Sequence, residues 1–193
     1  MRNTLKMTTK LRELPLSIQI KPKTIADREK INYGFAKLAS KDSSFRLTTD
    51  TNSDQTTIQC IDEFRLSQLL GRLVDEFLVE AEIGAPRVFY HQTDKELLEP
   101  IIKIHVETPE EYTSVILSDL RSRRGVILDQ DTLGKKTNID AFVPLANTFG
   151  YINSLLSMSS GHANYTLQFD HYAACPTDNN PDDQPPSTIA LRA

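Results

Sequence analysis

The alternation of apolar and polar residues along the first half of the chain predicts a regular order of strands and helices. Leu16, Ile18 and Ile20 alternate with polar residues, as in a strand buried on one face. Thr24 and Asp27 resemble a capping box and open a helix over about 25–40. The later elements are a hairpin of 45–49 and 56–60, a helix over about 63–78, and a last strand at 79–83 and 87–90 that is broken at 84–86. The predicted order is therefore βαββαβ.

The second half repeats this order. A strand at 101–106 precedes Thr108-Pro109-Glu110-Glu111, which offers an N-cap, a proline at the first helical position and a capping box. The apolar face of the helix that follows comprises Tyr112, Val115, Ile116 and Leu120. Strands at about 124–130 and 137–145, a helix with Phe149, Ile152, Leu155 and Leu156, and a strand with Tyr165, Leu167 and Phe169 complete the set. Thr24 and Thr108 are 84 residues apart, which indicates two copies of one unit.

The predicted fold class is α+β, with two tandem ferredoxin-like βαββαβ domains. Each is an antiparallel four-stranded sheet with two helices on one face. The predicted divisions are a flexible N-terminal tail (1–11), a first domain (12–92), a linker (93–99), a second domain (100–175) and a Pro/Asp-rich tail (176–193).

Composition narrows the function classes. No apolar run among the 193 residues approaches the roughly 20 needed to span a membrane. The net charge is −4, or +1 for residues 1–94 and −5 for 95–193, so RNA contacts would have to come from local basic clusters. Cys60 and Cys175 lie in no metal-ligand spacing, which favours a reducing compartment.

Motifs for catalysis are missing from the sequence. The seven glycines form neither of the common phosphate-binding loops, and there is no HExxH or GxSxG pattern. We therefore expect no catalytic residues, no metal and no cofactor. One cluster could carry function: Arg121, Arg123 and Arg124 offer three planar donor forks for phosphate oxygens. For that role we expect all three to be exposed and not paired with acids of their own domain. The same residues also fit the end of a helix, where positive charge is favoured.

Blocks of residues in both halves resemble a known family, elongation factor G. The first half resembles its domain III at KPKT (21–24), DSSF (42–45), QTTI (55–58), EFRL (63–66) and VEAEIGAPRV (79–88). The second half resembles its domain V at LEPI (98–101), TPEEY (108–112), RRG (123–125), VPLA (143–146), FGY (149–151) and FDHY (169–172). Both family domains have the βαββαβ fold. The family's GTP-binding domain, β-barrel domain and domain IV have no counterpart in the sequence.

The resemblance implies a function and candidate contact residues. Family domain V binds large-subunit ribosomal RNA, which assigns that role to Arg121, Arg123, Arg124 and His162, the last standing where the family has arginine. Family domain III contacts the GTPase domain and the small subunit, which makes Asp62, Glu63 and Arg65 candidates for interdomain or ribosome contacts. Around these three the family's glycines are lost, and Arg65 replaces a histidine.

We therefore expect a non-enzymatic translation factor that binds ribosomal RNA and ribosomal proteins at the factor-binding region, in the cytoplasm. A translational GTPase acting in trans is a further expected partner, whereas DNA and membranes are not. Two alternatives stay open. One is a protein-interaction module on the same scaffold, favoured by the acidic, Pro-rich tail, and the other is a split or decayed gene product.

Overall fold

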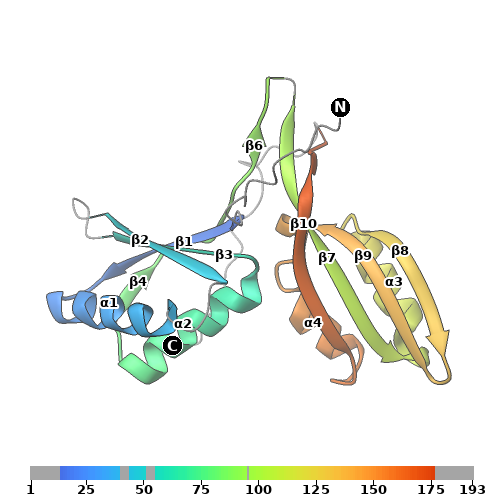
Figure 1. Ribbon diagram of the computed structural model, residues 1–193. Helices are drawn as coiled ribbons and strands as arrows, with labels where there is room; N and C mark the ends of the chain where they lie inside the picture. The colour runs from blue at the N-terminus through green and yellow to red at the C-terminus, as the bar shows by residue number, and fades with distance from the viewer. Residues whose placement is uncertain (1–13, 40–43, 51–54, 95, 177–193) are drawn as a thin grey trace, which may run out of the picture.

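Two antiparallel sheets, each covered on one face by helices, make up the computed structural model, which describes residues 14–39, 44–50, 55–94 and 96–176 (Figure 1). The first unit contains β1 (Leu16–Pro22), α1 (Ile25–Ala39), β2 (Phe45–Asp50), β3 (Gln55–Cys60), α2 (Glu63–Phe77), β4 (Ala81–Ile83) and β5 (Arg87–Val88). Its strand order is β2-β3-β1-β4, with β5 also paired to β1. The predicted N-terminal tail at 1–11 lies outside the described residues, as does the predicted C-terminal tail at 176–193 apart from its first residue.

The second unit has the strand order β10-β7-β9-β8, with β6 also paired to β7. Its elements are β6 (His91–Gln92), β7 (Leu97–Pro109), the 3₁₀ helix η1 (Glu110–Tyr112), α3 (Thr113–Ser122), β8 (Val126–Leu133), β9 (Lys136–Pro144), the 3₁₀ helix η2 (Leu145–Asn147), α4 (Tyr151–Met158) and β10 (Asn164–Ala174). The predicted α+β class with two ferredoxin-like units is confirmed. No helix in the described ranges is long and apolar enough to cross a membrane.

Helix α2 packs where its apolar stripe predicts. Leu66, Leu69, Leu70 and Leu73 are buried on one face of this helix. Where α1 crosses α2, a Cβ built on Gly34 would lie 2.9 Å from the Phe77 ring. Glycine at position 34 therefore allows the close approach of the two helices over the first sheet.

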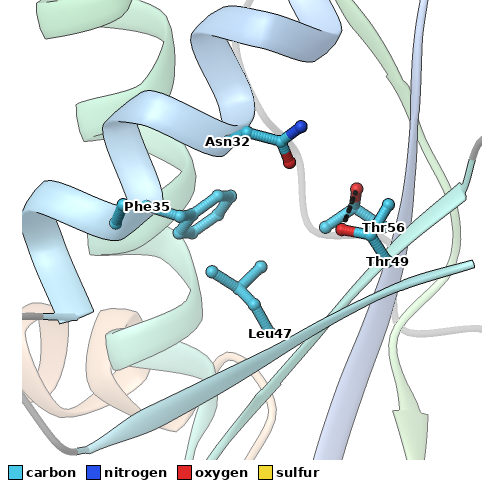
Figure 2. A pocket seen from close by; sticks show the side chains of 6 residues that line it. Asn32, Phe35, Leu47, Thr49 and Thr56 are labelled. Carbon is cyan, nitrogen blue, oxygen red and sulfur yellow. Dashed lines mark hydrogen bonds between the residues drawn. The ribbon is translucent and has the colours of Figure 1, made fainter.

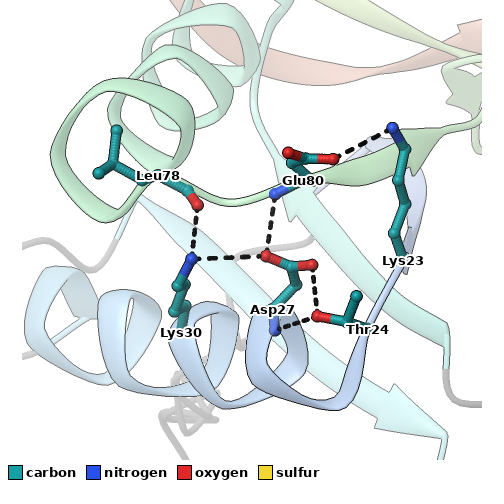
Figure 3. Close-up of polar contacts among 6 residues, drawn as sticks. All are labelled: Lys23, Thr24, Asp27, Lys30, Leu78 and Glu80. Atoms are coloured by element: carbon teal, nitrogen blue, oxygen red, sulfur yellow. Dashed lines mark hydrogen bonds and ion pairs between the residues drawn. The ribbon is translucent and has the colours of Figure 1, made fainter.

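The start of α1 is fixed by a network around Asp27 (Figure 3). The Thr24 hydroxyl accepts from the Asp27 N–H (3.1 Å) and donates to its carboxylate (2.6 Å), which confirms the predicted cap. The carboxylate also accepts from the Glu80 N–H at 3.2 Å and lies 3.6 Å from the Lys30 ammonium. Lys30 in turn donates to the Leu78 carbonyl at 2.8 Å. The network therefore ties the first turn of α1 to the segment that follows α2.

The capping box predicted at Thr108 is wrong. Strand β7 continues through Thr108, which lies opposite Thr137 of β9, and its buried hydroxyl makes no hydrogen bond. Helix α3 begins only at Thr113, after the 3₁₀ turn, and neither start has a side-chain cap. The later start changes the buried face: Ile116, Leu117 and Leu120 are buried, whereas Val115 is exposed.

The predicted linker at 93–99 is also corrected. Strand β7 already begins at Leu97, and Leu97 and Leu98 pair with Gln92 and His91 of β6 in a hairpin (Figure 1). Thr93 closes the turn by accepting from the Glu96 N–H at 3.0 Å and donating to the Glu96 carbonyl at 2.8 Å. The units are thus joined by paired strands, while the boundary between them stays a prediction.

Candidate functional site

Arg123 and Arg124 belong to the turn that ends α3. The Arg124 N–H donates to the Arg121 carbonyl (3.0 Å), and the Gly125 N–H donates to the Leu120 carbonyl (2.8 Å), as in a Schellman motif. Arg124 takes the left-handed position of this motif, with φ of 62°. A Cβ on Gly125 would lie 2.4 Å from the Leu120 carbonyl oxygen, so only glycine fits there.

Arg123 turns into its own domain. Its guanidinium lies over the Tyr151 ring, 5.3 Å from the centroid. It donates to the Asp119 carboxylate (2.8 Å), the carbonyls of Asn147 (3.0 Å) and Phe149 (3.2 Å) and the Ser154 hydroxyl (3.1 Å). These contacts hold the loop before α4 against the end of α3. The expectation that Arg123 is exposed and unpaired is therefore wrong.

Arg124 is also paired within its domain. Its two terminal nitrogens donate to the two carboxylate oxygens of Glu99 at 3.0 and 2.6 Å. The Glu99 side chain is 4% exposed and that of Arg124 is 31% exposed. A buried carboxylate needs such a partner, because leaving it charged and alone is costly. The expectation of an exposed, unpaired side chain is therefore wrong for Arg124 too. The Arg124 guanidinium instead neutralises the buried Glu99 carboxylate.

Arg121 and His162 are the exposed members of the predicted RNA-binding set. The Arg121 side chain is exposed in the last turn of α3 and makes no hydrogen bond or ion pair with any described residue. The His162 ring stacks loosely on Tyr112, with centroids 6.2 Å apart, and its Nδ1 lies 3.0 Å from the Ser159 carbonyl oxygen. Tyr112 precedes α3 and Arg121 lies in its last turn, so these two residues are about 14 Å apart along the helix axis, and His162 lies near the opposite end of α3 from Arg121.

The start of α2 lies against the second unit. Asp62 caps α2 by accepting from the Arg65 N–H at 2.8 Å. The Glu63 carboxylate accepts from the backbone N–H of Gly150 at 2.7 Å, and Gly150 is the N-cap of α4. Phe64 meets Tyr165 of β10 edge to face, with centroids 6.1 Å apart. The first turn of α2 thus contacts both α4 and β10, whereas Arg65 is exposed beside an open cleft between the units.

Burial raises the pKa of the Glu63 carboxyl, while the Gly150 N–H and Arg123 act to lower it. A carboxylate at a helix N-terminus is favoured by the helix dipole. Three helix ends consequently meet at this point: the start of α2 with Glu63, the start of α4 with Gly150, and the end of α3 with Arg123.

The sequence reasoning missed Glu99, Gly150 and Tyr165. Gly150 takes a left-handed φ of 70° and offers no side-chain cap to α4. Serine, threonine or aspartate usually caps the start of a helix, but Phe149 and Gly150 precede α4. This pattern indicates that the cap comes from elsewhere in the chain. The spacing in sequence could not show that Glu63 supplies it.

A second hollow lies between α1 and the β2–β3 hairpin (Figure 2). Phe35 and Asn32 of α1 face Leu47 of β2, and the hydroxyls of Thr49 and Thr56 lie 3.4 Å apart at one side. The cavity is about 190 Å³, smaller than the roughly 300–1,000 Å³ of most small-molecule sites. Across the described ranges no group of three potential metal ligands occurs.

The fold and this contact define a protein of tandem ferredoxin-like domains that touch through the start of α2. Residues 14–85 match the family model for elongation factor G domain III, and residues 96–182 match the model for the elongation factor G C-terminus. Together these matches cover most of the chain. The chain belongs to the elongation factor G family.

Curated relatives agree with this assignment. Elongation factor G of Paracoccus denitrificans is 32% identical over 272 residues, covering 83% of this chain and 38% of the relative. The Cereibacter sphaeroides and Jannaschia sp. proteins of that name are 32% and 31% identical, covering 83% of this chain and 39% and 38% of themselves. A crystal structure of a Thermus thermophilus protein shares the fold, with a TM-score of 0.59, 19% identity and coverage of 89% of this chain and 42% of that one.

The chain spans about two-fifths of the length of these relatives. The matched stretch of 272 residues is longer than the whole chain of 193, so the relatives carry residues within it that have no counterpart here. The two family-model matches are separated by residues 86–95 alone.

Proposed function

We propose that this elongation-factor-G-like protein binds the ribosome at the factor-binding region and has no GTPase activity of its own. The observation that carries the proposal is the exposed Arg121 guanidinium at the end of α3, on the domain matched by the elongation factor G C-terminus. An exposed guanidinium with no partner among the described residues is available to a phosphate oxygen. Under this proposal the protein's binding partners are ribosomal RNA and ribosomal proteins, and it acts in the cytoplasm.

GTP hydrolysis would come from outside this sequence. None of its seven glycines lies in a phosphate-binding loop. A translational GTPase acting in trans is therefore part of the proposal. Titration of the pure protein with GTP in a calorimeter should give no binding heat, and a stoichiometric complex would contradict this part.

A protein-interaction module on the same scaffold is the second candidate. It is favoured by the inward placement of Arg123 and Arg124, which removes two of the three guanidinium groups expected to face RNA. An interaction module does not need Arg121 to touch phosphate. The two candidates therefore differ in how ribosome binding responds to salt and to the loss of this one charge.

The test is co-sedimentation with bacterial ribosomes across a salt series. Phosphate-mediated binding weakens steeply as salt rises, and removing one phosphate contact reduces the log–log slope by roughly one unit. Arg121→Gln should reduce the slope by that amount, whereas Arg72→Gln, an exposed charge on α2, should not. Binding that ignores salt, or equal effects of both variants, would favour the interaction module.

A further inference from the structure

The face of the first sheet opposite α1 and α2 carries only polar side chains in its described strands. Because cross-strand neighbours share a face, the register places Ser17, Gln19 and Lys21 of β1 beside Gln59 and Thr57 of β3, with Arg46 and Thr48 of β2 on one side and Glu82 of β4 and Arg87 of β5 on the other. The apolar alternates of these strands, Ile18, Ile20 and Ile58 among them, are buried on the helical side. We call this polar surface the open face. Its described strands place no aromatic ring on it, and the exposed ring of Phe89 follows β5 at its edge, next to Arg87 in the pairing with β1.

Charge on the open face is divided between its two ends. One register row runs Arg46, Gln59, Ser17, Arg87 across four strands. Both arginines are exposed, and neither guanidinium pairs with any described side chain. Asp50 and Glu82 lie at the other end with Lys21. The row that we call the arginine row is therefore the electropositive end of this face.

The dimensions of the arginine row suit an extended polyanion. Neighbouring strands are about 4.8 Å apart, so the Cα atoms of Arg46 and Arg87 lie about 14 Å from each other. Between them, the partly exposed Gln59 offers an uncharged hydrogen-bonding group, whereas Ser17 is buried and donates weakly to the Arg87 carbonyl at 3.5 Å. Arginine, serine, threonine and glutamine are the side chains that commonly contact phosphates and sugars in nucleic-acid complexes.

We propose that the open face binds the sugar–phosphate backbone of single-stranded RNA, with Arg46 and Arg87 on phosphates. Charge complementarity carries this choice, since two guanidiniums without a described partner flank side chains that carry no charge. Protein interfaces have apolar, aromatic-rich centres, whereas the centre of the open face is polar. Because contacts to phosphates carry no sequence information, binding is indifferent to base sequence. The surface lies on the first domain, separate from the α3 surface of the proposed function.

Fluorescence anisotropy of the full chain with a labelled, short oligouridylate tests this inference. The variant is Arg46→Gln with Arg87→Gln, and the matched control is Lys135→Gln with Arg72→Gln, which removes the same charge from the exposed β8–β9 turn and from α2. Removing two single-strand phosphate contacts should reduce the salt slope by about 1.4. The control should leave the slope nearly unchanged, and oligoadenylate should bind as oligouridylate does.

Equal loss in the two double variants, or no binding of the wild type at low salt, would overturn the inference. A poly-glutamate peptide that displaces the labelled oligouridylate as well as unlabelled oligouridylate does would also overturn the inference. An acidic protein could then occupy the face equally well. Circular dichroism checks that both double variants fold. Arg121→Gln should retain oligouridylate binding while losing ribosome affinity, so failure of this inference is distinguishable from failure of the proposed function.

Discussion

The Glu63 carboxylate accepts a hydrogen bond from the Gly150 backbone N–H, 2.7 Å away and 87 residues later in the chain. One domain thereby supplies the helix cap of the other. The contact fixes the first turn of α2 on α4 without a covalent or metal link.

Removing this cap should weaken the contact between the domains. Glu63→Ala leaves the Gly150 N–H without its acceptor, at a cost of about 1–2 kcal/mol. Increased cleavage between the domains in limited proteolysis is the expected result. Glu76→Ala, on the exposed side of the same helix, should change little, and equal effects of both substitutions would show that Glu63 has no special role.

The charge of Glu63 gives a pH dependence of known sign. Because burial raises its pKa in the folded protein, the protonated form is favoured there, and this contribution to stability is lost as pH rises through the raised pKa. Glu63→Gln keeps an acceptor and removes the charge, so it should be at least as stable as wild type at pH 7. The difference should vanish below the ordinary glutamate pKa of about 4.3. Thermal unfolding at several pH values measures it, and a variant less stable at pH 7 would refute the sign.

Loss of Arg124 should destabilise the second domain more than a surface charge would. Arg124→Gln leaves the buried Glu99 carboxylate without its ion-pair partner, at a cost up to about 3 kcal/mol because the guanidinium is partly exposed. Urea unfolding of both single variants and of Glu99→Gln with Arg124→Gln measures the coupling. The double variant should recover part of the loss, and simple additivity would mean that the pair is not coupled.

Two helical glycines should respond oppositely to alanine. At Gly34 a Cβ would meet the Phe77 ring at 2.9 Å, so Gly34→Ala should cost about 1–3 kcal/mol. At Gly71 nothing lies within 4 Å, and Gly71→Ala should stabilise by up to about 1 kcal/mol through helix propensity. Chemical denaturation tests both, and a harmless Gly34→Ala would show that the helix crossing is looser than described.

Asp27→Asn should lower the melting temperature at neutral pH but not in acid. The Thr24 hydroxyl, followed by the Glu80 N–H, lowers the pKa of the Asp27 carboxyl. A lowered pKa contributes stability above the ordinary aspartate value of about 3.9, and this is lost as pH falls through the lowered value. Asp75→Asn on α2 is the control. A deficit that persists at pH 2 would assign the effect to shape rather than charge.

The periodic elements could be predicted from sequence because their signals are local. The stripe of Leu66, Leu69, Leu70 and Leu73 and the Thr24 cap need only neighbouring residues. The helix cap predicted at Thr108 is wrong because the pairing of β7 with β9 extends through this residue and outweighs the capping pattern. At this position the hydrogen bonds and packing of the sheet determine the structure more strongly than the local sequence does.

The candidate site was only partly accessible from sequence. Three arginines in four residues show a charge cluster, but not where each side chain points. Asp119 and Ser154 hold the Arg123 side chain, and Glu99, which lies 25 residues before Arg124 in the sequence, holds the Arg124 side chain. The Glu63 cap joins still more distant residues. Such contacts are set by the packing of complete elements, which spacing along the chain does not reveal.

Competition with full-length elongation factor G tests the central claim most directly. The labelled protein is bound to bacterial ribosomes at low salt, and unlabelled elongation factor G is added with a GTP analogue that is not hydrolysed. If the protein occupies the factor-binding region, it should be displaced stoichiometrically, and Arg121→Gln should be displaced at lower factor concentration. Binding to ribosomes that elongation factor G leaves unchanged, or no binding at all, would contradict the account.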